Sequence, residues 1–343
     1  MKIAITGAGG FIGRSLSSRL AVEGHEILAL DNDFRGALAS IAEHGGITPR
    51  SCDVLDLDDL RRAFAGADAV YHLAAINGTG NFYRIPDKVL EVGIIGTHNA
   101  LKATLANSIG RFYLASSSEV YETPPTIPTP ESVPCSVSDV FNPRQSYGGS
   151  KIAGELMTIN YLRGTETRFA IFRPHNVYGP QMGFEHVIPQ LVRSIMNEID
   201  RSPGARSVTI PLQGSGRETR AFIYIDDGVR AIETGTLHNP AGGVIHIGNE
   251  VETPIGKLAV EIGRVLGVDV DLKPGPIVAG SPSRRCPDTS RLRGLGFQPW
   301  VSLADGLERT VQWYAEHHRA TGAGVTPRNL STGVRQSDLK SSE

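Results

Sequence analysis

The amino-acid sequence predicts an α/β fold built on a doubly wound parallel sheet. Its first 173 residues alternate short apolar runs with stretches of helical apolar spacing, which is typical of βαβ units. The runs at 2–6 and 26–30 flank the glycine-rich turn GAGGFIG at 7–13, and the second run leads directly into Asp31. This layout is that of a Rossmann-type dinucleotide-binding unit.

The glycines of the turn each meet a steric demand of that unit. Gly7 permits the tight turn out of the strand, Gly10 leaves the pyrophosphate unobstructed, and Gly13 lets the helix pack closely on the strand. The free N–H groups at the helix start, around Phe11 and Ile12, favour bound phosphate together with the helix dipole. We therefore expect a dinucleotide pyrophosphate at this helix start.

Two acidic residues are expected at the adenosine end of the cofactor. Asp31 can accept hydrogen bonds from both ribose hydroxyls and would repel a 2′-phosphate, so we expect NAD rather than NADP. A third strand is expected at 50–54 and ends in Cys52, Asp53 and Val54. In this fold the Asp53 carboxylate can accept from the adenine amino group, and a simple turn aspartate is the alternative.

The next two elements concern the cofactor and the oligomeric state. A fourth strand is expected at 69–75, where the end residues Leu73, Ala74 and Ala75 leave room for the cofactor against the backbone. A long helix is expected at 87–107, with apolar residues on more than one face. Such a helix needs cover on two sides, so we expect the sheet on one side and the second subunit of a homodimer on the other.

The rest of the chain divides into a completed sheet and a second lobe. The NAD-binding domain is expected at 1–173, and 174–318 should form mainly a second lobe. The part at about 213–250 should return to the sheet, which makes the lobe discontinuous. The tail at 319–343 is rich in Ser, Thr and Gly without periodicity, so we expect it to be disordered. The remaining expected elements are strands at 111–115, 169–173 and 244–248 and helices at 57–65, 146–162, 185–199, 254–266 and 303–317.

Composition and charge argue against several classes of partner. The formal net charge of −2 favours neither nucleic acid nor an anionic membrane surface. No apolar run approaches the ~18 residues of a membrane span, and the N-terminus lacks the features of a signal peptide. Cys52, Cys135 and Cys286 are far apart and show no metal-ligand spacing. We therefore expect a cytoplasmic protein without a metal site.

Tyr147 and Lys151 are the strongest catalytic candidates. They are four residues apart on an expected helix and therefore share one face. A free tyrosine has a pKa of about 10 and is a poor base at neutral pH, but the Lys151 ammonium and a positive nicotinamide ring favour its phenolate. Tyr147 can then take the proton of a substrate hydroxyl while the hydride goes to NAD, and Ser117 can hydrogen-bond the same oxygen.

With these motifs the chain resembles the extended short-chain dehydrogenases/reductases of the NAD-dependent nucleotide-sugar epimerase/dehydratase group. The resemblance spans about residues 1–318 and rests on GAGGFIG, the acid Asp31, HLAA, SSSEVY, YGGSK, RPHNVYGP and ETRAFIYIDD. It implies a tightly held NAD that is reduced and reoxidised within one turnover. It also implies a nucleoside-diphosphate sugar as the substrate.

The resemblance further implies which residues bind that substrate. Asn176 and the strand ending at Arg220 would hold the diphosphate, Arg285 would add positive charge there, and the segment around Val187 and Ile188 would cradle the base. Arginine suits this task because its planar fork grips phosphate at two points. The complete set of expected substrate-binding residues is Ser117, Ser118, Asn176, Val187, Ile188, Arg220 and Arg285.

The resemblance leaves three reactions open, all beginning with oxidation of the sugar at C4. The 4,6-dehydratases carry a Thr-Ser-Glu string where this chain has Ser117, Ser118 and Glu119, and the Glu removes the C5 proton, which the C4 ketone acidifies. We therefore favour dehydration with Glu119 as an extra base. The alternatives are 4-epimerisation, decarboxylation of a nucleotide uronate and, more remotely, a non-catalytic NAD-binding module.

Three features depart from the pattern of the group, the first being Glu122, which stands where a Gly usually follows Val-Tyr. Gly93 stands in the long helix where these proteins usually carry an Asn, which leaves hydrogen bonding on the cofactor side of that region open. The segment INGTGNF at 76–82 matches no subgroup. The sequence explains none of the three.

Overall fold

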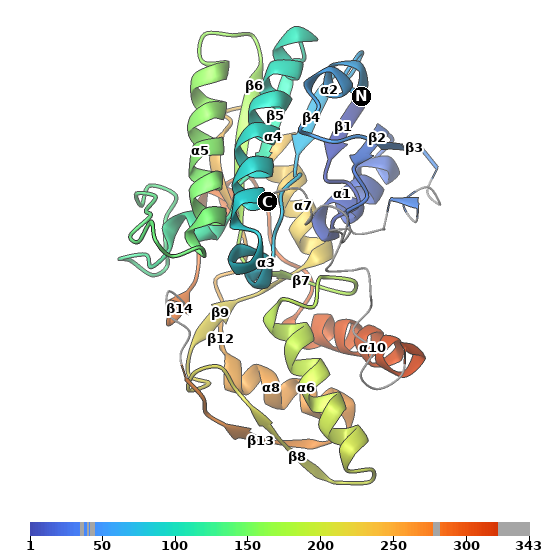
Figure 1. The fold of residues 1–343 in the computed structure, drawn as a ribbon, viewed down its shortest axis with the longest axis vertical. Coiled ribbons are helices and arrows are strands. Elements are labelled where there is room, and N and C mark those ends of the chain that lie inside the picture. The colour runs from blue at the N-terminus through green and yellow to red at the C-terminus, as the bar shows by residue number, and fades with distance from the viewer. Residues whose placement is uncertain (35–37, 40, 42–44, 277–281, 322–343) are drawn as a thin grey trace, which may run out of the picture.

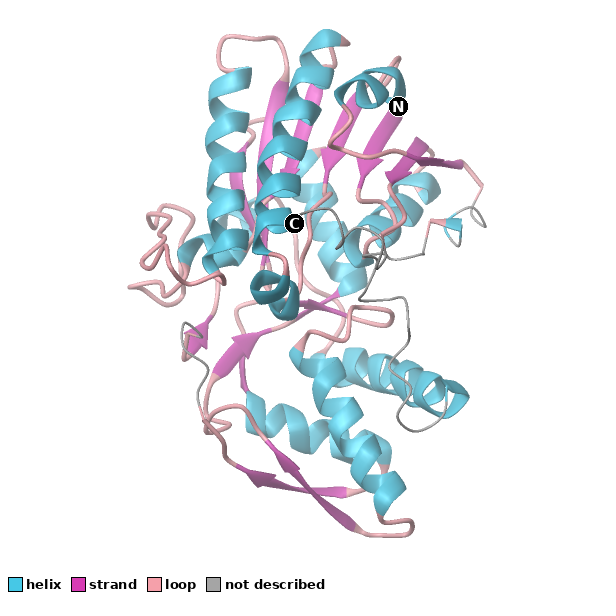
Figure 2. Ribbon diagram, in the orientation of Figure 1, coloured by secondary structure: helices cyan, strands magenta, loops and turns pink. Residues whose placement is uncertain are grey.

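The architecture is that of a parallel sheet with helices on both faces and a second lobe beneath it (Figure 1). It comes from a computed structural model that describes residues 1–34, 38–39, 41, 45–276 and 282–321. The seven parallel strands follow the order β11-β6-β5-β4-β1-β2-β3 (Figure 2). Their bounds are β1 Lys2–Thr6, β2 Glu26–Asp31, β3 Ile47–Ser51, β4 Ala69–His72, β5 Arg111–Ala115, β6 Arg168–Pro174 and β11 Gly243–Ile247.

Helices cover both faces of this sheet, as its apolar strands require. Helices α1 (Phe11–Val22) and α7 (Ile225–Thr236) pack on one face. The other face is covered by α2 (Leu57–Ala63), α4 (Pro86–Ala106) and α5 (Gln145–Leu162). Alternate residues of each strand enter opposite cores: Ile3 and Ile5 of β1 lie in one core and Ala4 in the other. The predicted Rossmann-type sheet is confirmed.

Two strands are shorter or displaced relative to the sequence prediction. Strand β3 ends at Ser51, so the expectation of a strand at 50–54 is wrong by three residues. The chain turns instead, because the Asp53 carboxylate accepts a hydrogen bond from the Leu55 N–H at 2.9 Å. Strand β4 likewise ends at His72, and Leu73–Ala75 form the loop beyond it.

The second lobe is built from three helices that pack on one another: α6 (Val187–Arg201), α8 (Ile255–Leu266) and α10 (Leu303–Thr321). A parallel pair of strands, β8 (Ser207–Pro211) and β13 (Asp269–Lys273), covers them. Because α10 extends to Thr321, the expectation that the tail begins at 319 is wrong for three residues. Positions 322–343 lie outside the described residues.

The two lobes are joined by short elements and a shared core. Strand β11 pairs with β6 at the sheet edge and α7 packs on the sheet, as expected for the returning segment. One apolar core contains residues of both the sheet and the second lobe, including Ile5 and Leu258. The joining elements are α3 Thr79–Arg84, β7 Val177–Tyr178, β9 Thr219–Ala221, β10 Ile223–Tyr224, β12 Glu252–Pro254, β14 Arg284–Arg285, α9 Ser290–Gly294 and a 3₁₀ turn at Ser118–Tyr121.

Candidate active site

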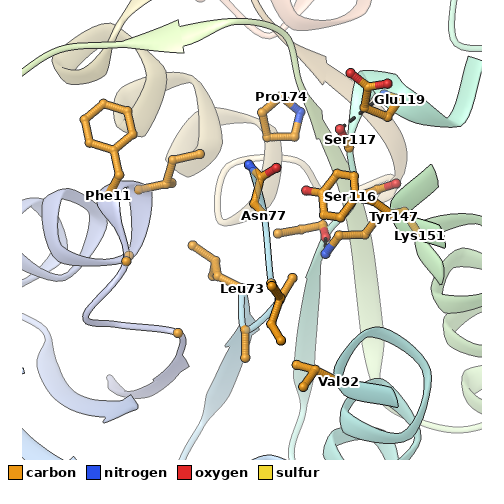
Figure 3. A pocket seen from close by; sticks show the side chains of 18 of the residues that line it. Phe11, Leu73, Asn77, Val92, Ser116, Ser117, Glu119, Tyr147, Lys151 and Pro174 are labelled. Atoms are coloured by element: carbon orange, nitrogen blue, oxygen red, sulfur yellow. Dashed lines mark hydrogen bonds between the residues drawn. The ribbon is translucent and has the colours of Figure 1, made fainter. Parts of the chain in front are cut away.

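A pocket opens at the carboxyl ends of the central strands, where parallel α/β sheets bind their ligands. Two residues from segments beyond the sheet domain, His186 and Arg285, form part of its wall. Figure 3 shows Ser117, Glu119, Tyr147 and Lys151 on one side of the pocket and Phe11 on the opposite side. The pocket brings together every residue expected to bind the cofactor: Gly7, Gly10, Phe11, Ile12, Gly13, Asp31, Asp53, Val54, Leu73, Ala74, Ala75, Tyr147 and Lys151.

The glycine turn forms a backbone cradle at one end of this pocket. Gly7 adopts a φ of +72°, and a Cβ atom on Gly13 would lie 2.1 Å from the Gly7 carbonyl oxygen, so neither position tolerates a side chain. The Asp31 carboxylate accepts a hydrogen bond from the Gly9 N–H at 2.9 Å, which ties the acid to the turn. A helix start, a bare backbone and an acid at this spacing fit an NAD dinucleotide.

Asp53 has the turn-stabilising role considered for it and also lines the pocket. Its carboxylate accepts from the Leu55 N–H and, at 3.3 Å, from the Asn32 side chain, so it stabilises a turn. It also lines the pocket beside Val54, which is buried against Gly96 of α4. Asp53 therefore has a structural role, and its contact with the adenine end of the cofactor stays a prediction.

Tyr147 and Lys151 lie on the first two turns of α5 and face the pocket (Figure 3). The Lys151 Nζ lies 5.6 Å from the centre of the Tyr147 ring and donates a hydrogen bond to the Ala115 carbonyl oxygen at 2.8 Å. Burial lowers the pKa of Lys151 to about 8, and the Glu155 carboxylate opposes that shift. The pair thus has the geometry expected from its spacing, with Ser117 also in the pocket wall.

Glu119 is held by arginines. Its carboxylate forms ion pairs with Arg285 at 2.6 Å and with Arg144 at 3.6 Å. Although burial alone would raise the pKa of Glu119, the charges of Arg285, Arg144 and Arg220 lower it to about 2. The side chain lines the pocket with Ser117 and Ser118, but it is a weaker base than an ordinary carboxylate.

The two arginines expected at the diphosphate are adjacent in the structure but differ in access. Strands β14 and β9 pair so that Arg285 lies opposite Arg220. Arg285 lines the pocket, whereas Arg220 does not. Burial and the charge of Arg285 lower the pKa of Arg220 to about 10, so the pair concentrates positive charge behind the pocket wall.

Of the remaining residues expected to bind the substrate, some line the pocket and others pack in the core. Asn176 lines the pocket, and its side chain also donates to the Ala221 carbonyl oxygen at 3.0 Å. The segment around Val187 and Ile188, expected to cradle the base, can do so only in part through side chains, because the Ile188 side chain is fully buried in the core. Val187 packs against the same core, and the pocket is bordered instead by the preceding residue, His186. The amphipathic start of α6 directs its apolar side chains inward.

Several pocket residues were not predicted as site residues. Asn77 and Ser116 follow the ends of β4 and β5, and Pro174 ends β6. This position at the carboxyl edge of a parallel sheet is the signal that could have identified these three. His175 is not among them, because it is buried and packs against His246 with ring centres 4.7 Å apart. The pocket residues in question are Asn77, Thr79, Phe82, Val92, Ser116, Pro174 and His186.

Two further features of the described residues concern metals and membranes. Within that part of the chain, no cluster of His, Cys, Asp and Glu side chains is arranged to hold a metal ion. Among its helices, none has the length and apolar character needed to cross a bilayer.

A family model and the relatives found by comparison with known proteins indicate the same family. The model of the NAD dependent epimerase/dehydratase family matches residues 3–248. UDP-glucuronic acid decarboxylase 1 of Xenopus tropicalis is 30% identical over 91% of this chain and 72% of its own length. A dTDP-glucose 4,6-dehydratase of Streptomyces niveus is 30% identical over 92% of this chain and 94% of its own.

A solved structure agrees with these relatives. The dTDP-glucose 4,6-dehydratase of Streptomyces venezuelae, with NAD and TYD bound, is 29% identical, covers 93% of this chain and 98% of its own, and has a TM-score of 0.79. The cofactor is therefore NAD. With its parallel sheet, glycine cradle and Tyr147–Lys151 pair, the chain belongs to the NAD-dependent epimerase/dehydratase family, within the extended short-chain dehydrogenases/reductases.

Proposed function

We propose that the protein acts on a nucleoside-diphosphate sugar and begins by oxidising the sugar at C4. Tyr147 takes the proton of the C4 hydroxyl, and Ser117 hydrogen-bonds the same oxygen. Lys151 keeps positive charge next to the phenol. Bound NAD supplies the hydride acceptor for this oxidation and the hydride donor for the later reduction. The support is the meeting of these three side chains with the glycine cradle in one pocket.

Of the reactions that can follow, the geometry favours decarboxylation of a nucleotide uronate. The observation that carries this choice is the guanidinium of Arg285. Its Nη1 binds Glu119, whereas its Nε and Nη2 are buried and have no hydrogen-bond partner among the described residues. Two such N–H groups on one edge match the two oxygens of a carboxylate. Because Arg285 pairs with Glu119, which stands two residues from Ser117, we infer that its guanidinium lies near the sugar end of the pocket.

Decarboxylation also agrees with the weak basicity of Glu119. A sugar with a ketone at C4 and a carboxylate on C5 is a β-keto acid. Breaking the bond from C5 to the carboxylate releases carbon dioxide and leaves the electron pair in an enolate over C4 and C5. A proton then adds to C5, and the C4 ketone is reduced to the alcohol. No C5 proton has to be removed, so a carboxylate with a pKa of about 2 is no handicap.

Dehydration of the 4,6-dehydratase type is the second candidate. It is favoured by the position of Glu119, which lines the pocket beside Ser117, within the expected reach of a C5 proton. It requires Glu119 to accept that proton, and the ion pairs with Arg285 and Arg144 oppose this step. A 4-epimerisation would need neither Glu119 nor Arg285 at the sugar.

Mass spectrometry of products distinguishes these reactions. The purified protein is incubated with UDP-glucuronic acid, dTDP-glucose and UDP-N-acetylglucosamine. We expect UDP-glucuronic acid to lose carbon dioxide. Loss of water from dTDP-glucose would favour dehydration, and unchanged mass with a new stereoisomer would favour epimerisation. If no sugar is converted and no NADH absorbance develops, the enzymatic proposal is wrong and a non-catalytic NAD-binding module remains.

A matched pair of variants tests the role of Arg285. Arg285→Gln removes the free N–H edge and should lower turnover of the uronate about tenfold to a hundredfold, as expected for the loss of charge-assisted hydrogen bonds. Arg284→Gln is the control, because Arg284 is about half exposed and pairs with Glu252 outside the pocket. Equal activity of the two variants would contradict a carboxylate-binding role.

We also propose that the protein is a homodimer that associates through α4 and α5. These helices lie side by side on the outer surface of the sheet domain (Figure 1). Leu90 and Ile95 of α4 and Leu156 of α5 are exposed, with 38%, 47% and 58% of their surface accessible. Burying such side chains against the same helices of a second copy would remove apolar surface from water.

A further inference from the structure

The segment at 76–82, which the sequence left unexplained, lies directly against the catalytic tyrosine. It continues into the short helix α3, and the ring of Phe82 stacks on the ring of Tyr147 with centres 4.9 Å apart and planes 14° from parallel. Phe82 is only 4% exposed and also lines the pocket. Neither the cofactor motif nor the Tyr147–Lys151 pair requires this contact.

Tyr147 is separated from the two main cores by this arrangement. Its ring belongs to a small apolar cluster with Phe82 and Val89, against which Ala75 and Ile76 pack. The ring is therefore supported by α3, its preceding loop and Val89 of α4 rather than by the strands of the sheet. A change in α3 should move the phenol while leaving the sheet and the glycine cradle unchanged.

Hydrogen bonds within the segment hold α3 in one conformation. The Asn77 side chain accepts from the Gly78 N–H at 2.7 Å, and the Asn81 side chain donates to the Asn77 carbonyl oxygen at 3.0 Å. Arg84 donates to the Asn81 side-chain oxygen at 2.7 Å. These bonds link residues before and after Phe82, so they restrain the turn that presents its ring.

The same segment is tied to the second lobe. The Gly80 N–H donates to a carboxylate oxygen of Glu185 at 3.2 Å, and Glu185 immediately precedes His186 of the pocket wall. A Cβ atom on Gly80 would lie 2.8 Å from that oxygen, and one on Gly78 would lie 3.3 Å from the Glu185 side chain. The two glycines therefore make room for Glu185. Figure 1 shows α3 at the lower end of α4, where the sheet domain meets the second lobe.

We propose that Phe82 is a positioning residue for Tyr147, held in place by the contact of α3 with Glu185. This inference rests on the proposed function, in which the Tyr147 hydroxyl takes the proton of the C4 alcohol. The stacked ring sets the tilt of the phenol and keeps water from one of its faces. Because proton transfer requires hydrogen-bond reach, a displacement of about 1 Å at the phenol is enough to slow it strongly.

Substitution of Phe82 tests this role against a matched control. Phe82→Leu keeps apolar bulk but removes the stacked ring, and it should lower kcat about tenfold or more while KM changes less than about threefold. Phe82→Tyr retains the ring and should restore most of kcat. Tyr83→Leu is the control, because Tyr83 lies on the same helix, is 46% exposed and does not line the pocket.

Glu185 provides a second pair of variants. Glu185→Gln retains an oxygen that can accept from the Gly80 N–H and should resemble the wild type. Glu185→Ala removes that acceptor and should lower kcat in the same direction as Phe82→Leu, by a smaller factor. If both Glu185 variants match the wild type, the tie to the second lobe has no part in positioning Tyr147.

Two readouts separate positioning from mere packing. If Phe82→Leu lowers Tm but leaves kcat unchanged, the ring only fills space and the inference is wrong. A crystal structure of Phe82→Leu with NAD should show the Tyr147 ring displaced or in several orientations, and an unchanged ring would overturn the inference without any activity measurement. If the wild type converts no nucleotide sugar, the proposed function is wrong. The crystal structure of Phe82→Leu would even then show whether Phe82 positions the Tyr147 ring.

Discussion

Lys151 should determine the alkaline limit of activity. Its pKa is lowered to about 8 by burial, so its charge is present below that pH and is lost as the pH rises through it. Without the charge the Tyr147 phenolate is less favoured, and kcat/KM should fall about tenfold per pH unit above about pH 8. A pH–rate profile measures this limb. In Lys151→Arg, which stays protonated, the limb should disappear.

The lowered pKa of Lys151 also predicts how the free energy of unfolding changes with pH. Unfolded Lys151 has its ordinary pKa of 10.5, so between about pH 8 and 10.5 the unfolded chain binds more protons at this site than the folded one. The contribution of Lys151 to the free energy of unfolding should therefore rise with pH across this window. Comparing denaturant unfolding of wild type and Lys151→Met at several pH values isolates this contribution. A difference between them that stays constant with pH would contradict the buried, titrating lysine.

Glu119→Gln separates the two leading reactions. In decarboxylation Glu119 only orients Arg285, and a glutamine oxygen can still accept from Nη1, so turnover should stay within about tenfold, or ~1.4 kcal/mol. In dehydration the loss of this base should lower kcat by a factor of about 10²–10⁴. Glu122→Gln is the control, because Glu122 pairs with Ser138 and Gln145 and does not line the pocket.

What could be predicted at the residue scale depends on separation along the chain. Tyr147 and Lys151 share one helix, so their spacing alone places them together. Glu119 and Arg285 are 166 residues apart, and no local pattern reveals that they meet at 2.6 Å. The identity of Glu119 as a pocket residue could therefore be predicted, but the ion pair that makes it a weak base could not.

At the scale of the elements, the close approach of α4 and α5 explains Gly93. A Cβ atom there would lie 2.6 Å from the Cβ atom of Ser150, whose hydroxyl donates to the Tyr147 carbonyl oxygen. Alanine usually stabilises an exposed helix position by up to about 1 kcal/mol relative to glycine, but here Gly93→Ala should destabilise by about 1–3 kcal/mol through overpacking. Denaturant unfolding measures this change.

Gly154→Ala is the control for that prediction. Gly154 also lies on α5 facing α4, but a Cβ atom there would meet its neighbours at 3.6 Å, which is ordinary contact. Its substitution should be neutral or stabilising. If both variants are equally stable, the helices can move apart, and Gly93 is not required for their packing.

The elements that were misplaced have short or irregular sequences. Helix α3 has only six residues and begins with Thr-Gly, so it is too short to show a helical period. The sequence therefore could not assign a structure to the segment at 76–82. The edge strand β3 contains Pro49, which an edge position tolerates, and its apolar pattern is too weak to define its ends. The long helices α4, α5 and α8 were predicted to within one residue or so at each end, because their periodic patterns extend over several turns.

At the scale of the whole molecule, the active site depends on two parts of the chain that meet in space. The cradle and the catalytic helix belong to the sheet domain, whereas Arg285 and His186 come from segments beyond it. The first part follows from consecutive βαβ units and could be predicted. The second part depends on how the lobe packs against the sheet through a shared core, as Ile188 shows, since its side chain enters that core rather than the pocket.

The oligomeric state is the last prediction and concerns the complete molecule. If α4 and α5 form the interface, light scattering at micromolar concentration should give the mass of a dimer. The double variant Ile95→Glu and Leu156→Glu should then give a monomer, because charged side chains would have to be desolvated in the interface. Val260→Glu is the control, since Val260 on α8 is as exposed as Ile95 but lies in the second lobe. A wild-type monomer, or a dimer that survives the double variant, would exclude this interface.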